Sequence, residues 1–127
     1  MNKEDKELLL KDLSARLTYK VKVCLYEKET CILTGIDGNE VYLNVDSDSF
    51  RIGSIKPYLR PMSSMTEEES DEFQQLDTEC DKMPTFDYVS IEHYRIFDWL
   101  NAHHFDYRGL IEKGLALQAP EGMYNLK

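Results

Sequence analysis

The sequence predicts an α+β fold in which an N-terminal helix precedes a four-stranded antiparallel meander and two to three C-terminal helices. Three observations carry this prediction. Leucines recur at helical spacing over residues 3–17, apolar and polar residues alternate between residues 19 and 55, and helical spacing returns after residue 66.

The chain has 127 residues, 42% of them hydrophobic, a length and composition typical of one globular domain. We expect a single domain with three parts. These are a helix and meander over 1–61, an acidic helix and linker over 62–87, and a helical part over 88–127.

The first helix is expected over residues 3–17. Leu10, Leu13 and Leu17 lie on one face because they are spaced by three and then four residues. Asn2 is a suitable N-cap, and the acidic residues that follow it suit the positive end of the helix dipole.

Alternating residues predict the strands of the meander, which are expected over 19–26, 30–36, 40–45 and 50–55. Asp37-Gly38 marks a tight hairpin because glycine accepts a positive φ. Pro57 and Pro61 are expected to close the sheet, since proline interrupts both ladder and helix. A short, strongly bent meander favours a small SH3-like barrel, and an open sheet covered by the first helix fits the same pattern.

Thr66 and Glu69 match the capping box of a second helix, expected over 67–80, whose inner face carries Phe73, Leu76 and Cys80. A linker that contains Pro84 follows it. Ser90 is a suitable N-cap for a third helix. The third helix is expected over 91–103.

Asp106 is expected to cap a short final helix over 107–113, with Gly114 as its C-terminal glycine. A short edge strand over 115–119 and a loosely held tail from Pro120 complete the expected organisation.

The net charge of −9 is concentrated in one segment. Residues 62–87 carry nine acidic side chains and one lysine, whereas residues 1–61 are balanced. Binding of double-stranded nucleic acid is therefore disfavoured, because it requires clustered Lys and Arg. No apolar stretch approaches the length of a membrane span and the N-terminus does not resemble a signal peptide, so we expect a cytoplasmic protein without membrane contact.

The three cysteines, Cys24, Cys31 and Cys80, form no C-x-x-C pair. This spacing is unsuited to a disulfide framework or a zinc knuckle. Cys24 and Cys31 fall in expected strands and are interpreted as small core residues.

Histidines and one carboxylate form the cluster with metal-binding or acid–base potential: His93, His103, His104 and Asp106. Adjacent residues on a helix point about 100° apart, so His103 and His104 cannot both bind one metal from a regular turn. We expect no catalytic residue, no metal and no cofactor. A small metal-dependent hydrolase that uses His103, His104 and Asp106 is kept as an alternative.

Aromatic side chains beside arginine are typical anchors of protein interfaces, and core packing is the competing explanation for them. Two groups qualify, one on the less apolar side of the sheet and one near the third helix. The candidate binding residues are Tyr26, Tyr42, Arg51, Trp99, His103, His104, Asp106, Tyr107 and Arg108.

Two stretches, SIKPYLRPMSSMTEEE at 54–69 and WLNAHHFDYRGLIEKGLALQAPEGM at 99–123, resemble a group of small uncharacterised proteins of gut Bacteroides-type bacteria and their phages or prophages. The resemblance implies a mobile-element context and a cytoplasmic setting. It transfers no functional residue.

The absence of a recognisable nucleophile and base, together with the aromatic candidates and the acidic segment, predicts a non-enzymatic binding or accessory protein that acts through protein contacts. The alternatives are a protein that sequesters a small molecule or nucleotide and the hydrolase described above.

Overall fold

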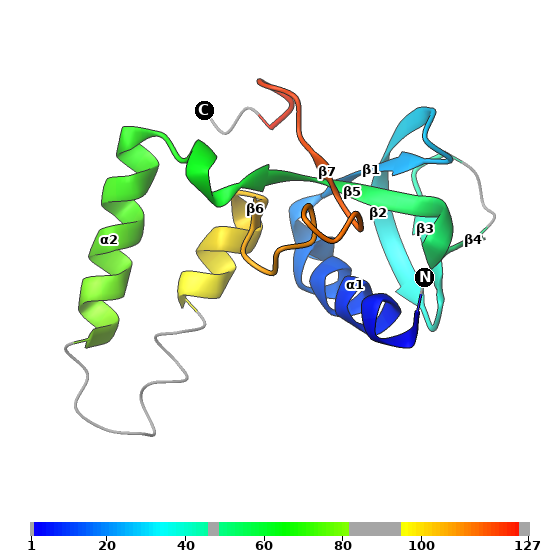
Figure 1. Ribbon diagram of the computed structural model, residues 1–127, viewed down its shortest axis with the longest axis horizontal. Coiled ribbons are helices and arrows are strands. Elements are labelled where there is room, and N and C mark those ends of the chain that lie inside the picture. Colours follow the sequence, from blue (N-terminus) through cyan, green and yellow to red (C-terminus); the bar gives the residue numbers. More distant parts are fainter. Residues whose placement is uncertain (1, 46–48, 82–94, 125–127) are drawn as a thin grey trace.

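The computed structural model describes residues 2–45, 49–81 and 95–124 and has a mixed α+β fold, as the sequence predicted (Figure 1). In the view of Figure 1, α1 lies against the sheet. The green helix α2 stands at the opposite end of the molecule from β4.

Helix α1 spans Lys3–Arg16, close to the expected range. The side chain of Asn2 accepts a hydrogen bond of 2.7 Å from the Asp5 N–H, which confirms the predicted N-cap. Leu9 and Leu13 are fully buried and turn the helix toward the sheet.

Five antiparallel strands are present where four were expected: β1 Lys22–Leu25, β2 Glu29–Asp37, β3 Glu40–Leu43, β4 Ser49–Arg51 and β5 Ile55–Pro61. The first four form the meander, and β5 returns to pair with β1. Their order is β4-β3-β2-β1-β5, and each adjacent pair is antiparallel. The expected strand over 50–55 is split by a 3₁₀ turn, Ile52–Ser54. The predicted hairpin between β2 and β3 is present, with Gly38 at a φ of 63°.

The prediction that Pro57 interrupts the sheet is wrong, because β5 runs through this residue and ends at Pro61. Pro57 lies opposite Val23 of β1. Proline is tolerated in a strand wherever the ladder needs no N–H at its position, and this pairing meets that condition.

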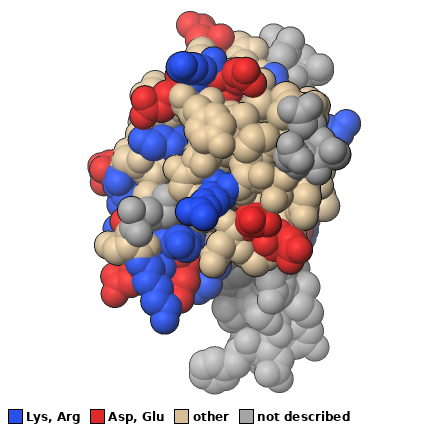
Figure 2. Space-filling view, turned by 90° about the vertical axis from the view of Figure 1, so that its right-hand side faces the viewer, with Lys and Arg blue, Asp and Glu red and all other residues tan. Residues whose placement is uncertain are grey.

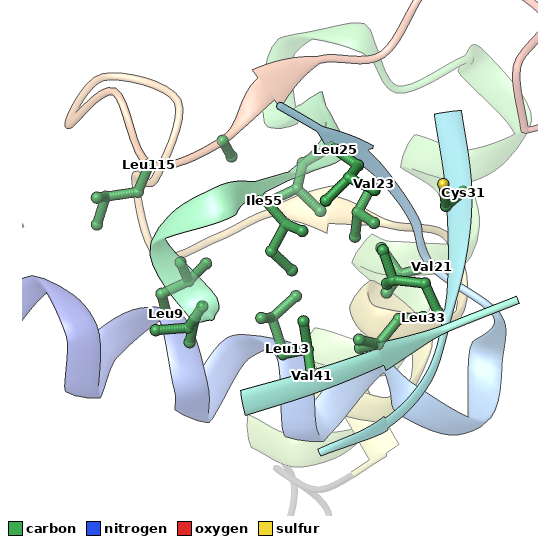
Figure 3. Packing of buried hydrophobic residues seen from close by; sticks show 14 of the residues in the cluster. Leu9, Leu13, Val21, Val23, Leu25, Cys31, Leu33, Val41, Ile55 and Leu115 are labelled. Atoms are coloured by element: carbon green, nitrogen blue, oxygen red, sulfur yellow. The ribbon is translucent and has the colours of Figure 1, made fainter. Parts of the chain in front are cut away.

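The main core lies between α1 and the curved sheet. Figure 3 shows Leu9 and Leu13 of α1 facing Val21, Leu33 and Val41 across this core. Leu115 joins the same cluster from the C-terminal segment. Cys24 and Cys31 are buried free thiols, as expected, whereas Cys80 lies outside the described side chains.

Helix α2 spans Glu67–Asp81 and has the predicted capping box. The Glu69 N–H donates to the Thr66 hydroxyl and the Glu69 carboxylate accepts from the Thr66 N–H. Residues 95–102 are helical, which agrees with the expected end of the third helix, and its expected N-cap Ser90 lies outside the described residues, as do Pro84 and His93.

A second apolar cluster joins α2 to this helical segment. Phe73 and Leu76 of α2 pack against Ile96, Leu100 and Phe105.

The expected helix over 107–113 is wrong, because these residues form turns. Both carboxylate oxygens of Asp106 accept backbone hydrogen bonds, from the Leu110 and Ile111 N–H groups, and Gly114 has a φ of 75°. The capping signals that favoured a helix therefore close a compact loop instead.

Two short strands pair in parallel with β5: β6 Phe105–Asp106 and β7 Leu117–Gln118. The second falls within the expected edge strand. The expectation of a loosely held tail is wrong for the described part, since the Tyr124 hydroxyl accepts from the Lys22 N–H at 2.9 Å and donates to the Tyr58 carbonyl at 2.8 Å.

Candidate binding cleft

A stack of three rings lies beside the candidate site, and of these rings that of His103 lines it. Trp99 and His103 share one face of the helical segment because they are four residues apart, and their ring centroids lie 4.1 Å apart. Phe105 of β6 stacks on Trp99 at 5.7 Å. The Nδ1 atom of His103 lies 2.8 Å from the Trp99 carbonyl oxygen and so carries the proton of that hydrogen bond.

Arg60 of β5 connects this stack to α2. Its guanidinium lies 4.2 Å from the centre of the Phe105 ring and forms two hydrogen bonds with Glu69, of 2.8 and 2.6 Å. Hydrogen bonds from Arg60 lower the pKa of Glu69 to about 2. The paired, flat geometry clamps the first turns of α2 onto β5.

Glu72, one turn further along α2, is also held in place. The indole N–H of Trp99 donates to its carboxylate at 3.0 Å, and Phe73 packs against the Trp99 ring at 5.8 Å. One oxygen of the Glu72 carboxylate is thus held by Trp99, which orients this side chain.

The C-terminal segment forms the opposite wall. The ring of Tyr124 stacks on the buried ring of His104 at 3.8 Å. Burial lowers the pKa of His104 to about 3, so this imidazole is neutral at pH 7. The backbone N–H of Ala119 donates to Leu59 of β5, which fixes the segment along that strand.

Between these walls lies a cleft of about 780 Å³. Five charged side chains line it: Arg60, Glu68, Glu69, Glu72 and Glu121. Since Arg60 is already paired with Glu69, the charge that the described residues direct at the cleft comes from the three other carboxylates. A concave surface lined by charge of one sign concentrates ions of the opposite sign.

The structure does not bring His103, His104 and Asp106 together as one site. His103 lines the cleft, whereas His104 has a φ of 62°, which turns its ring to the Tyr124 side. Asp106 uses both oxygens in its loop. Within residues 2–45, 49–81 and 95–124, no group of three His, Cys, Asp or Glu side chains is arranged to hold a metal ion.

Tyr107 and Arg108 belong to a different network. The Tyr107 hydroxyl donates to Asn101 at 2.9 Å, and the Arg108 guanidinium lies 5.0 Å from the centre of the Tyr107 ring. Arg108 also bonds to Asp12 of α1 at 3.2 Å. These two candidates therefore join α1 to the C-terminal part and do not line the cleft.

The other three candidates lie in the sheet or in the turn next to it. Tyr26 follows β1, Tyr42 lies in β3 and Arg51 in β4, and all three are exposed. Figure 2 shows the right-hand side of the molecule, where basic and acidic side chains both border an uncharged area. The charge on this face is mixed, unlike that of the cleft.

Sequence reasoning missed Arg60, Glu121 and Tyr124 as site residues. The capping box identified Glu69 as a helix-start residue but gave no sign of its partner Arg60. The concentration of acid after residue 62 was the available signal for the cleft.

Comparisons with protein-family models, with curated proteins and with solved structures found no match. None of the helices in the described part of the chain has the length and apolar character needed to cross a membrane.

Proposed function

We propose that this chain is a non-enzymatic binding protein that receives a basic segment of a partner protein in the cleft. One observation carries the proposal: among the described residues three unpaired carboxylates line the cleft, and the one Lys or Arg among these lining residues, Arg60, is already paired with Glu69. A Lys- or Arg-containing segment is the chemistry that complements such a surface.

The walls of the cleft are pre-organised, which favours binding. Arg60 and Glu69 hold the first turns of α2, and Trp99 orients Glu72. Because Glu72 is already oriented, ordering of this side chain opposes association less than it would for a free carboxylate.

The proposal extends to the setting of the protein, a cytoplasmic accessory factor of a phage or mobile element. It rests on the resemblance carried by residues 54–69 and 99–123. These two stretches supply most of the residues that line the cleft.

We also propose that β1–β5 form a small SH3-like barrel. The antiparallel order β4-β3-β2-β1-β5 and the 3₁₀ turn between β4 and β5 support it. The first half of β2 pairs with β1 and the second half with β3, with a register shift between Leu33 and Gly35. Such irregularities let one strand bend into both halves of a barrel.

We propose no hydrolytic role for His103, His104 and Asp106, because their side chains are engaged in three separate interactions, with Trp99, with Tyr124 and with the 110–111 backbone. This separation of the side chains is the reason for preferring a binding role.

The test is a binding titration of a fluorescein-labelled tetra-arginine peptide, followed by anisotropy. Glu68→Gln, Glu72→Gln and Glu121→Gln together are expected to weaken binding at least tenfold. Glutamine at 72 still accepts from the Trp99 indole, so the wall is preserved. Binding is also expected to weaken as salt rises from about 50 to about 300 mM, since the attraction is between charges.

A matched control makes the same change of charge on exposed sites outside the cleft, Glu4→Gln, Glu7→Gln and Glu112→Gln. It should bind as the unmodified protein does. Equal losses in the two triple variants would show that net charge alone attracts the peptide and would overturn the proposal.

A further inference from the structure

The turn between β1 and β2 has an unfavourable backbone for its residues. The Lys28 N–H donates to the Leu25 carbonyl at 3.0 Å, and the two central residues, Tyr26 and Glu27, have φ values of 51° and 61°. Turns of this type normally use Asn and Gly. A bulky residue in the left-handed region is an outlier, and such strain gathers at functional sites.

Tyr26 is also the most exposed large hydrophobic side chain of the described residues, at 59%. The residue is nevertheless held in place. Its ring contacts the Phe50 ring edge-on, with centroids 6.2 Å apart, and its backbone N–H donates to the Ser54 carbonyl at 3.0 Å. The turn therefore presents a fixed aromatic ring to solvent.

This ring lines a groove of about 340 Å³, within the range of small-molecule sites. Cys24 and Leu117 give the groove apolar surface. At Gly53 an added Cβ would meet no atom within 4 Å, so the backbone is open to a ligand there.

One cation, Lys56, is among the described residues that line the groove. Lys56 is half-buried in β5 and forms no ion pair with any residue in the described ranges. Glu27, the acidic residue of the groove, is exposed at the turn. The attraction between a half-buried ammonium and an anion is screened less by water than the repulsion between an exposed carboxylate and the same anion. Lys56 therefore favours an anionic ligand more than Glu27 disfavours it.

We propose that this groove binds a small molecule that carries a flat unsaturated ring and one anionic group. The ring stacks on Tyr26 and over Gly53, and the anion pairs with Lys56. A nucleoside monophosphate and an aromatic carboxylate share this chemistry. The groove shares no lining residue with the cleft, so either site can be disproved alone.

The test is titration calorimetry with AMP and with indole-3-acetate, each as the probe, and with adenosine as the uncharged comparator. We expect at least one of the two anions to bind. If AMP binds, adenosine should bind at least tenfold more weakly, because it lacks the anionic group. Binding of AMP alone assigns the groove to nucleotides, and binding of indole-3-acetate alone assigns it to carboxylates. Binding of neither overturns the proposal.

Substitutions in the groove test whether the ligand binds there. Gly53→Leu fills open space and should abolish binding with an unchanged fold, and Lys56→Gln should weaken it at least tenfold. Lys28→Gln, an exposed lysine of the same turn outside the groove, is the matched control and should have no effect. Unchanged binding in Gly53→Leu contradicts the proposed site.

Tyr26→Asn separates strain from binding. Asparagine tolerates a positive φ, so the melting temperature should rise by a few degrees while ligand binding is lost. Retained binding in this variant would exclude stacking on Tyr26.

Discussion

Asp12 and Arg16, two charged residues of α1, have no exposed surface. They lie one helical turn apart and form two hydrogen bonds, of 2.9 and 3.1 Å. Arg16 also donates to the carbonyl of Phe105, and Arg108 bonds to Asp12. This buried pair therefore ties α1 to the segment that carries the ring stack of the cleft.

We expect Asp12→Ala to destabilise the protein by about 3–5 kcal/mol, because it leaves the charge of Arg16 buried without its partner. Replacing both residues, Asp12→Leu with Arg16→Met, should cost much less, since no isolated charge remains. Urea unfolding measures both variants.

Glu7→Ala, an exposed acidic residue of the same helix, serves as the control and should stay within about 0.5 kcal/mol of the unmodified protein. A loss below about 1 kcal/mol in Asp12→Ala would show that the pair does not support the fold.

At this scale the sequence predicted the N-cap and the buried cysteines Cys24 and Cys31, which depend on near neighbours. Of the expected leucine face, Leu13 is buried, whereas Leu10 and Leu17 are only partly buried.

The sequence did not reveal Asp12 and Arg16 as core residues. In the sequence they resemble an exposed helical pair, and the carbonyl that completes their site lies 89 residues from Arg16.

Among the elements, α2 was predicted closely because a capping box and an apolar stripe are local patterns. The docking of α2 onto β5 was not predicted. It depends on Arg60, which precedes the helix, and no sequence pattern identifies this arginine as the partner of Glu69. The passage of β5 through Pro57 and the two-residue strand β6 escaped prediction for a related reason: these pairings have no period of their own and depend on distant partners. The strand β7 falls within the edge strand expected over 115–119.

The clamp on α2 should be sensitive to acid. In the folded protein the pKa of Glu69 is lowered to about 2, so the unfolded state binds the proton first as pH falls. The stabilisation by Glu69 is complete above its ordinary pKa of about 4.5 and is lost as pH approaches 2. Fluorescence of Trp99, the one tryptophan of the chain, reports this because α2 packs on its ring.

We expect the emission of Trp99 to change between about pH 4.5 and 2, and Glu69→Gln to shift toward the acid spectrum at pH 7. Glu68→Gln, an exposed neighbour outside the Arg60 pair, should follow the unmodified profile. An acid transition of equal size in Glu69→Gln would show that Glu69 is not the group responsible for it.

Across the whole molecule, the C-terminal strand β7 separates two concave surfaces. Leu117 lines the groove near Tyr26, and its neighbour Gln118 lines the acidic cleft, because successive residues of a strand point to opposite faces. The sequence predicted that negative charge would be concentrated after residue 62. Only the pairing of β5 with the C-terminal segment showed that part of this charge faces a cleft.

The most direct test of the cleft is an amide ¹H–¹⁵N spectrum recorded during addition of unlabelled tetra-arginine. Binding in the cleft predicts progressive shifts for Arg60, Glu68, Glu72 and Glu121, with Tyr42 and Arg51 at the sheet end unchanged. Shifts confined to the sheet end, or no shifts at millimolar peptide, would contradict the assignment of the cleft as the binding site.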